Sequence, residues 1–406
     1  MKRPTLAELL RPQLDLVIGL RRSLHAYPET ARQEHRSTAA VSELLKAAGL
    51  EVQLLPGTGL IADVGPGEPV VGLRADLDAL PMTERTGLPY ASQTPGVMHA
   101  CGHDVHTATV AGAGLLLAEL HAAGRLPHGV RLLFQPAEET MPGGALDVLG
   151  TGVLDGLHAL YGVHCDPSLD VGLVGLKAGP ITSASDTVTV LLNGTGGHTS
   201  RPHLAGDLVF ALGQVVTTLP AVVARRVDPR AGVNLTWGVI AAGEAPNAVP
   251  SEGFISGTLR CMETEAWQHA GELVESVVAD IVRPYAVTAE VTIVRGVPPV
   301  DNDPRATSVL EEAARAELGP ASVTPTRQSL GGEDFGWYLH HLPGAMVRLG
   351  TRTPGGKTYD LHRVDYAPDE ACIELGTRLL AATAASPAAD LGPATGGTGQ
   401  VTRYGR

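Results

Sequence analysis

Residues 99–106 read HACGHDVH and place a thiol, three imidazoles and a carboxylate within eight positions. Gly102 permits a sharp turn of the backbone, which would bring the Cys101 sulfur and a ring nitrogen of His103 toward one point. That arrangement suits a metal ion. The alternative is a buried turn in which both side chains pack as small core groups. The segments on either side decide between the two.

Upstream of this motif lies a predicted strand, 70–75, and the stretch RADLDALP occupies residues 74–81. Open α/β sheets place their ligand crevice where strands end, which is where Asp76 and Asp78 stand. We interpret Asp78 as a carboxylate that orients a metal-bound imidazole. A solvated turn carboxylate is the alternative.

Downstream, two further predicted strands, 129–135 and 159–163, also end in side chains that bind metals. The first is followed by adjacent carboxylates, Glu138 and Glu139, which repel each other unless cations lie near. One of them could bind metal while its neighbour takes a proton from water. The alternative is a pair that favours the dipole of the next helix. The second strand delivers His164, and three strand ends together would complete a pocket.

Bulk composition limits the class of protein. A chain of 406 residues exceeds the size at which one hydrophobic core keeps growing, so two domains are expected. A net charge of −13 excludes the basic face that nucleic acids require. The four cysteines form no CxxC pair, which favours a reducing cytoplasm over a disulfide framework. The most apolar segment, 108–120, is too short to cross a membrane, and no signal sequence is expected.

The alternation of predicted elements divides the chain. Residues 181–296 carry the order βαββαβ of a ferredoxin-like α+β sandwich, with strands at 187–192, 233–241, 254–260 and 287–294 and helices at 204–219 and 263–283. The flanking parts, 1–180 and 297–386, read as one α/β catalytic domain into which that sandwich is inserted. Its helices are expected at 5–25, 38–48, 104–123, 304–318 and 368–384. Residues 387–406 read as a flexible tail.

The inserted domain contains the stretch GGHTSRPH at 196–203. Its glycines permit close backbone approach, and His198 could donate a hydrogen bond to a developing oxyanion. A surface-loop histidine is the alternative. The edge strands and a helix of this domain could meet a twin subunit.

Nine motifs, in order over residues 15–385, resemble a known family. They are RADLDALP, HACGHDVH, QPAEE, GVH, GGHTSRPH, GEAPNAVP, GTLR, GGEDF and the single His362. They are similar to metallopeptidase family 20, the binuclear family of aminoacylases and carboxypeptidases. Within it they match the amidohydrolase branch that includes hippurate hydrolases and indole-acetyl-amino-acid hydrolases. The resemblance implies a mixed-sheet catalytic domain with an inserted lid or dimerisation domain.

The resemblance also implies roles for individual residues. Two divalent ions would be held by Cys101, His103, Glu139, His164 and His362, with Cys101 where relatives outside this branch use a bridging aspartate. Glu138 matches the general base, which takes a proton from water and passes it to the leaving nitrogen. His198 matches a residue that reaches the carbonyl oxygen, often from the partner subunit. Asn247 and Arg260 match substrate-contacting positions, and Arg260 is the candidate clamp for a carboxylate.

The expected activity is hydrolysis of the amide bond of N-acyl or aryl-acyl amino acids to a carboxylic acid and a free amino acid. A dipeptidase or carboxypeptidase of the same family is the alternative, and a non-catalytic relative that keeps the metal or ligand pocket is a further one. Thiolate, imidazole and carboxylate ligands suit Zn²⁺, Mn²⁺, Co²⁺ or Ni²⁺ without choosing among them. The expected partners are the small-molecule substrate and a second copy of the chain in a homodimer or higher homo-oligomer, with no nucleic acid and no membrane.

Overall fold

The computed structural model describes residues 3–393 and divides the chain into two compact units. Of the described residues, 3–181, 300–327 and 334–393 form the first unit, and 182–299 and 328–333 form the second. The chain passes from the first unit to the second at 181/182 and returns at 299/300, where the sequence analysis placed the boundaries at 180/181 and 296/297. Short segment 328–333 crosses to the second unit again, which the sequence pattern did not predict. Residues 394–406 of the predicted tail lie outside the described part.

An eight-stranded mixed sheet forms the centre of the first unit, in the order β1-β2-β4-β3-β5-β16-β6-β15. Its four central strands, β4, β3, β5 and β16, are parallel, and antiparallel pairs flank them. The strands are β1 (Glu51–Leu54), β2 (Leu60–Val64), β3 (Pro69–Asp76), β4 (Gly129–Gln135), β5 (Ala159–Asp170), β6 (Val174–Leu176), β15 (Val323–Pro325) and β16 (Gly344–Arg352). A short pair, β7 (Gly179–Pro180) and β14 (Asp301–Asn302), stands apart.

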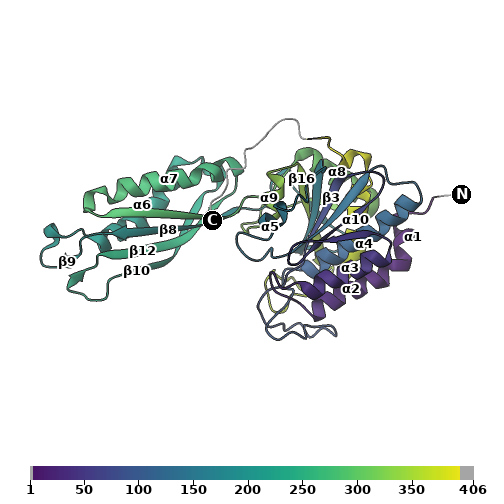
Figure 1. Ribbon diagram of the computed structural model, residues 1–406, viewed down its shortest axis with the longest axis horizontal. Helices are drawn as coiled ribbons and strands as arrows, with labels where there is room; N and C mark the ends of the chain where they lie inside the picture. The colour runs from purple at the N-terminus through teal and green to yellow at the C-terminus, as the bar shows by residue number, and fades with distance from the viewer. Residues whose placement is uncertain (1–2, 394–406) are drawn as a thin grey trace. The chain divides into compact units, whose positions relative to one another are not determined.

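Helices pack against this sheet, as Figure 1 shows. They are α1 (Leu6–Leu10), η1 (Arg11–Gln13), α2 (Leu14–Ala26), α3 (His35–Ala47), α4 (His103–Ala122), α5 (Ala145–Leu149), α8 (Pro304–Leu318), α9 (Phe335–Leu339), α10 (Ala371–Ala384) and the turn η5 (Pro387–Ala389). Helix α4 is buried along most of its length, in agreement with the apolar run 110–118 in its centre. The single predicted helix over 5–25 is wrong: the chain changes to a 3₁₀ turn at Pro12, because proline offers no N–H to continue an α-helix.

The second unit is an antiparallel four-stranded sheet in the order β10-β12-β8-β13, with α6 and α7 on one face (Figure 1). Its elements follow the chain order βαββαβ: β8 (Ala184–Asn193), α6 (Leu208–Arg226), β10 (Asn234–Ala242), β12 (Glu252–Cys261), α7 (Thr264–Val282) and β13 (Thr288–Val297). This order and pairing give the expected ferredoxin-like arrangement. The predicted helical limits 204–219 are displaced, because η2 (Pro202–Leu204) precedes α6 and α6 continues through Pro220 to Arg226.

Smaller elements complete the second unit. Strand β9 (Gly197–His198) pairs with β11 (Ala248–Val249), and two 3₁₀ turns are η3 (Pro229–Ala231) and η4 (Arg283–Tyr285). By length and apolar composition alone, helix α6 is long enough to cross a membrane. It packs against α7 and against the sheet, and core helices of folded domains share this composition.

A buried cluster of charges holds the start of α4 in place. The Asp104 carboxylate accepts a hydrogen bond from His25 Nδ1 at 2.8 Å and forms an ion pair with Arg21, whose Nε lies 2.8 Å from Asp104 Oδ2. His25 Nε2 lies 3.2 Å from Glu84 Oε1, and Arg21 Nη1 lies 3.2 Å from Glu370 Oε1. The cluster therefore ties α2, α4, the 84 loop and the start of α10 together next to His103. Breaking a buried charge pair leaves its partner uncompensated, which is strongly destabilising.

We predict that His25 makes stability depend on pH. Burial opposes its protonation, but Asp104 outweighs burial and raises the pKa of His25 from 6.5 to about 9. The stabilisation is therefore complete below pH 6.5 and is lost as the pH rises through about 9. Urea unfolding of metal-saturated protein should show a loss on the order of 2 kcal/mol between pH 6 and 9.5, over and above that of His25→Gln. Equal losses in the two proteins would contradict this assignment.

Candidate metal centre

The HACGHDVH segment turns at Gly102 and delivers its side chains to the sheet edge where β3 and β4 end. Gly102 has φ +90°, and a Cβ there would lie 2.7 Å from Cys165 Sγ. Only glycine meets both conditions, so the turn predicted from the sequence is present. His103 opens α4 directly after it.

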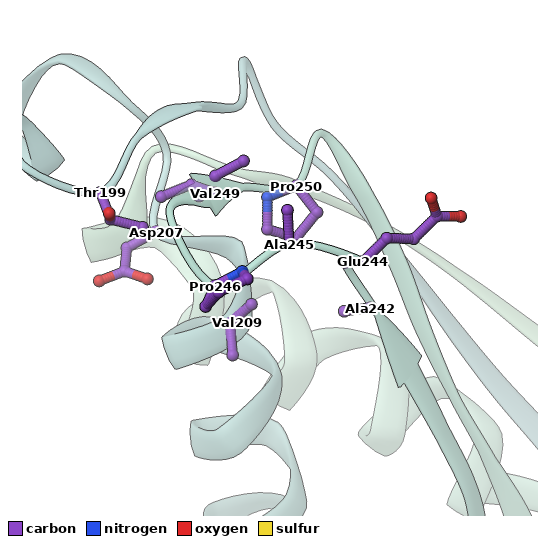
Figure 2. A pocket seen from close by; sticks show the side chains of 11 residues that line it. Thr199, Asp207, Val209, Ala242, Glu244, Ala245, Pro246, Val249 and Pro250 are labelled. Carbon is purple, nitrogen blue, oxygen red and sulfur yellow. The ribbon is translucent and has the colours of Figure 1, made fainter.

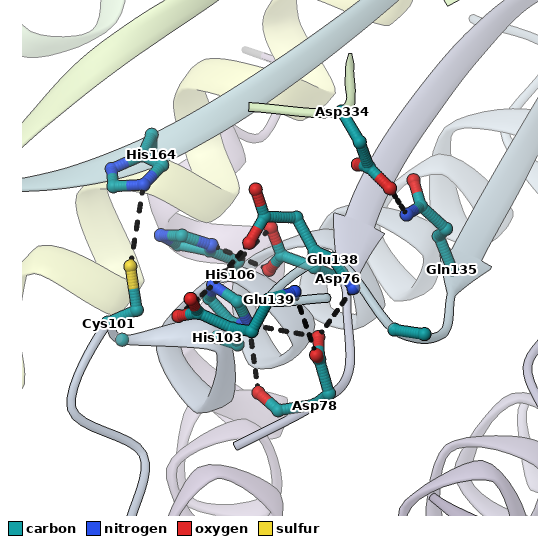
Figure 3. A network of polar contacts seen from close by, with 12 residues as sticks. Asp76, Asp78, Cys101, His103, His106, Gln135, Glu138, Glu139, His164 and Asp334 are labelled. Carbon is teal, nitrogen blue, oxygen red and sulfur yellow. Dashed lines mark hydrogen bonds and ion pairs between the residues drawn. The ribbon is translucent and has the colours of Figure 1, made fainter. Parts of the chain in front are cut away.

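The five predicted metal ligands converge within the first unit. His362 Nε2 lies 3.3 Å from Glu139 Oε1, and Cys101 Sγ lies 3.6 Å from His164 Nε2. His103 Nε2 lies 3.8 Å from Glu139 Oε1 and 3.9 Å from Glu138 Oε2. Figure 3 shows Cys101, His103, His164 and both glutamates around one space. Glu139 belongs to two groups of donor atoms that lie within 4.8 Å of one another, one with Cys101 and His362 and one with His103 and Glu138.

Backbone contacts fix two of these ligands. His362 donates its amide N–H to the Ala100 carbonyl at 2.9 Å, which holds it beside Cys101 despite their distance in sequence. His164 lies inside β5, which continues to Asp170, so the expected end of that strand at Val163 is wrong. The pairing of β3 with β5 ends at Arg74 and Gly162. His164 lies two residues beyond this last pair, so it has no partner on β3.

The orientation of two imidazoles suits metal binding. His103 Nδ1 donates to the Asp78 carbonyl oxygen at 2.8 Å, and His164 Nδ1 donates to the Cys165 carbonyl oxygen at 2.8 Å. Each ring thereby carries a proton on Nδ1, which leaves Nε2 as the nitrogen that can bind a metal. This is the tautomer that a metal ligand needs.

The residues fit divalent ions by a second criterion. His103 Nε2 and Glu139 Oε1 are buried and make no hydrogen bond of ordinary geometry within the described chain. Such atoms cost free energy unless something compensates them, and a cation between a thiol, imidazoles and a carboxylate would do so. Burial, with Glu139 adding to it, raises the pKa of the Cys101 thiol well above its usual value. A cation would be needed to stabilise the thiolate.

Asp78 holds the glutamate pair rather than an imidazole ring alone. Its Oδ1 accepts the Glu138 N–H and its Oδ2 accepts the Glu139 N–H, each at 3.0 Å. Its carboxylate lies 3.4 Å from His103 Nδ1, but the shorter contact of that ring is to the Asp78 backbone carbonyl. Asp78 therefore contacts the amides of both glutamates and the His103 ring, and its main contact differs from the one expected.

Two neighbouring residues, Asp76 and His106, were not predicted to act at the site. His106 Nδ1 donates to Asp76 Oδ1 at 2.7 Å, and the Cys165 N–H donates to His106 Nε2 at 2.8 Å. Both ring nitrogens are thus committed, so His106 braces the backbone beside His164. Burial opposes the charge of Asp76, but His103, His106 and Arg74 outweigh it and hold the pKa of Asp76 well below its usual value. The spacing of His103 and His106 on α4 was the available signal.

His198, Asn247 and Arg260 belong to the second unit, and their place relative to the metal ligands stays a prediction. The exposed His198 accepts the Ser200 N–H at Nδ1, at 3.1 Å, so its proton lies on Nε2 and is available to donate. The Asn247 carbonyl accepts the Thr199 N–H at 3.2 Å, beside the β9–β11 pair. Arg260 Nη1 donates to the Leu330 carbonyl at 2.7 Å.

A pocket of about 410 Å³ lies beside the segments that carry His198 and Asn247. Figure 2 shows its wall of small and proline side chains with two carboxylates, Asp207 and Glu244. Asp207 already accepts the Phe210 N–H at the start of α6. None of the five metal-ligand candidates lines this pocket.

The comparisons with known proteins agree with this geometry. A family model described as peptidase family M20/M25/M40 matches residues 72–386. A Bacillus subtilis protein named N-acetyl-L-cysteine deacetylase is 39% identical over 88% of this chain and 84% of its own length. A solved Bacillus subtilis structure, described as a dinuclear metal-binding peptidase of the M20 family, is 34% identical with a TM-score of 0.81 over 92% of this chain and 98% of its own.

A longer relative needs separate treatment. A Rhodococcus jostii protein named as a glutamate–cysteine ligase is 48% identical over 90% of this chain. The chain spans 46%, about half, of that protein's length. Its name therefore describes a protein of which this chain matches only a part.

We predict that replacing the Cys101 thiol weakens metal binding, whereas replacing the nearby Cys165 thiol does not. Cys101→Ser should lower the metal affinity roughly 100-fold or more, because loss of an outer contact to a metal ligand already costs 10–100-fold. Cys165→Ser is the matched control, since Cys165 is also buried but lies outside the ligand set. Metal content after dialysis, measured by mass spectrometry, checks this. Equal metal loss in both variants would remove Cys101 from the ligands.

Proposed function

The chain belongs to peptidase family M20/M25/M40 and is a hydrolase that uses divalent metal ions to cleave amide bonds, and we propose that its substrates are N-acyl or aryl-acyl amino acids. The products would be a carboxylic acid and a free amino acid. The observation that carries this proposal is the pair Glu138 and Glu139, which share one site with three imidazoles and a thiol. Adjacent carboxylates with separate contacts suit one ligand and one base.

In this mechanism Glu138 is the general base. Its amide is held by Asp78, and its carboxylate lies at the edge of the ligand cluster, near His103 Nε2. It would take a proton from the attacking water and deliver it to the leaving nitrogen. The chemistry that divalent ions supply at such a site is polarisation of the amide carbonyl and a lower pKa for water. The ligands Cys101, His103, Glu139, His164 and His362 would hold two such ions.

His198, Arg260 and Asn247 complete the proposal as substrate contacts. The Nε2–H of His198 would donate to the carbonyl oxygen as negative charge develops on it, from the same chain or from a partner subunit. Arg260 would bind the carboxylate of the amino-acid half through paired N–H donors. Asn247 would contact the substrate beside His198, because their backbones are joined through the β9–β11 segment.

The amino-acid half of the substrate is proposed to include cysteine. Cysteine appears in the names of two Bacillus subtilis deacetylases to which this chain is similar. A dipeptidase or carboxypeptidase is the second candidate, favoured by the family's description as peptidases. We propose Zn²⁺, Mn²⁺, Co²⁺ or Ni²⁺ as the metal. The four cysteines form no disulfide, which supports a cytoplasmic location.

A homodimer is proposed from the second unit. Strand β10 lies at the edge of its sheet, and Val239 and Ile240 on it are 51% and 57% exposed. An unpaired edge with exposed apolar side chains is a surface on which a second copy can pair.

The first test of the proposed function is a substrate panel. Purified protein loaded with each of the four metals should release amine from N-acetylcysteine, other N-acetyl amino acids and hippurate faster than from dipeptides. Chelation should stop the release. Faster cleavage of dipeptides would favour the peptidase alternative, and no release with any metal while ligand still binds would leave a non-catalytic relative.

Glu138→Gln is the matched variant for this assay. It keeps the shape of the side chain but cannot accept a proton, so kcat should fall roughly 10²–10⁴-fold. Metal content should stay that of the unaltered protein, because Glu139 is the proposed ligand. Full activity in Glu138→Gln would exclude it as the base.

We predict a dimer at micromolar concentration in light scattering, and a monomer for Ile240→Lys, because a charge on the edge strand opposes pairing. Leu54→Lys is the matched control, since Leu54 is also 59% exposed and lies on an edge strand, β1, of the other unit. A monomeric unaltered protein, or loss of the dimer in both variants, would contradict this interface.

A further inference from the structure

Three consecutive backbone amides carry the glutamate pair, and each donates to a buried carboxylate. Asp78 binds the amides of Glu138 and Glu139. The third amide, of Ala137, donates to Glu34 Oε1 at 2.8 Å. Glu34 is fully buried and stands at the start of α3, about a hundred positions earlier in the chain. Glu34 and Asp78 therefore hold the backbone of the segment 137–139, which contains the proposed base Glu138.

Ala137 needs such a contact because of its backbone. Its φ is +58°, in the left-handed region that residues with a side chain disfavour. It is completely buried, and the turn that it makes comes directly before Glu138. A strained conformation persists only where surrounding contacts hold it. The contact from Glu34 is the hydrogen bond made by Ala137's own N–H.

The other hydrogen bonds of the Glu34 carboxylate go to nearby residues. Oε1 also accepts the Arg32 N–H at 2.9 Å, and Oε2 accepts the Thr58 hydroxyl at 2.6 Å. Burial raises the pKa of Glu34, and these donors oppose that rise. All three contacts are to neighbouring parts of the protein, and none is to a metal-ligand candidate.

Residues 32–34 make a second contact with the segment that carries the glutamate pair. Arg32 Nη1 donates to Thr140 Oγ1 at 2.9 Å, and its Nη2 lies 2.9 Å from Asp147 Oδ2. These contacts are exposed and contribute little alone. They place residues 32–34 on both sides of the glutamate pair, before it at Ala137 and after it at Thr140.

We propose that Glu34 is a positioning residue that sets the place of the general base, an inference that rests on the proposed function of Glu138. By holding the left-handed turn at Ala137, it lets the carboxylates of two adjacent residues reach one site. A displacement near 1 Å at a reacting group can cost on the order of 100-fold in rate. The effect should fall on kcat, because Glu34 touches neither substrate nor metal.

The test compares Glu34→Ala with Glu34→Gln. Glu34→Ala, assayed with saturating metal, should lower kcat roughly 100-fold with KM within about threefold. Glu34→Gln should restore kcat to within about fivefold of the unaltered protein, since the amide oxygen still accepts from Ala137 and Arg32 and its NH₂ can donate to a rotated Thr58 hydroxyl. Should Glu34→Ala fail to fold, Glu34→Asp takes its place, because its shorter side chain moves the carboxylate away from Ala137. Unchanged kcat in Glu34→Ala or Glu34→Asp, or equal losses in Glu34→Gln, would overturn the proposal.

A second variant addresses the turn itself. Adding Ala137→Gly to Glu34→Ala should recover kcat several-fold, because glycine adopts a left-handed φ without strain. A merely structural role for Glu34 predicts no recovery, and that result would count against the proposal.

Hydrogen exchange separates this proposal from the proposed function. The amides of residues 137–140 should exchange at least tenfold faster in Glu34→Ala than in the unaltered protein or in Glu34→Gln. If the unaltered protein proves inactive on every amide, the proposed function fails, and faster exchange still shows that Glu34 holds the turn. Unchanged exchange in an active enzyme would overturn the positioning role alone.

Discussion

Two carboxylates that are neighbours in the chain must reach the same small volume, and the structure depends on overcoming their repulsion. Glu138 and Glu139 lie almost equally far from His103 Nε2, at 3.9 and 3.8 Å. Side chains of adjacent residues on an extended chain point in opposite directions, so a straight backbone could not place them there. The turn at Ala137 and the carboxylates of Glu34 and Asp78 beneath it solve the problem of direction. Cations solve the problem of charge.

The same principle extends outward from the metal ligands. Three buried imidazole rings in this region are each held by a backbone group. The carbonyls of Asp78 and Cys165 keep a proton on Nδ1 of His103 and of His164, and the Cys165 amide donates to Nε2 of His106. The Arg21, His25 and Asp104 cluster then anchors the helix that carries His103. Proton positions at the site are thus decided by backbone atoms, which cannot rearrange independently of the fold.

Features with a local sequence signal could be predicted. Features that depend on contacts between residues far apart in the chain could not. The turn at Gly102, the fold class and the βαββαβ order could be predicted, because glycine, strand ends and alternation leave a signal within a short window. The break at Pro12 was predictable from the same kind of signal and was overlooked. The length of β5 was not, because His164 continues a strand whose pairing depends on β16. Glu34 gave no signal at all, since its contact with Ala137 exists only after α3 packs against the sheet.

The order of the ligands along the chain has a consequence for biosynthesis. Cys101, His103, Glu139 and His164 precede the inserted unit, whereas His362 follows it. A ribosome must therefore synthesise the second unit before His362 emerges. Until then, the proposed ligands Cys101, His103 and His164 lack this last partner. With the proposed ligands, complete metal loading would be a late event, and a chain truncated before His362 would lack one ligand beside Cys101.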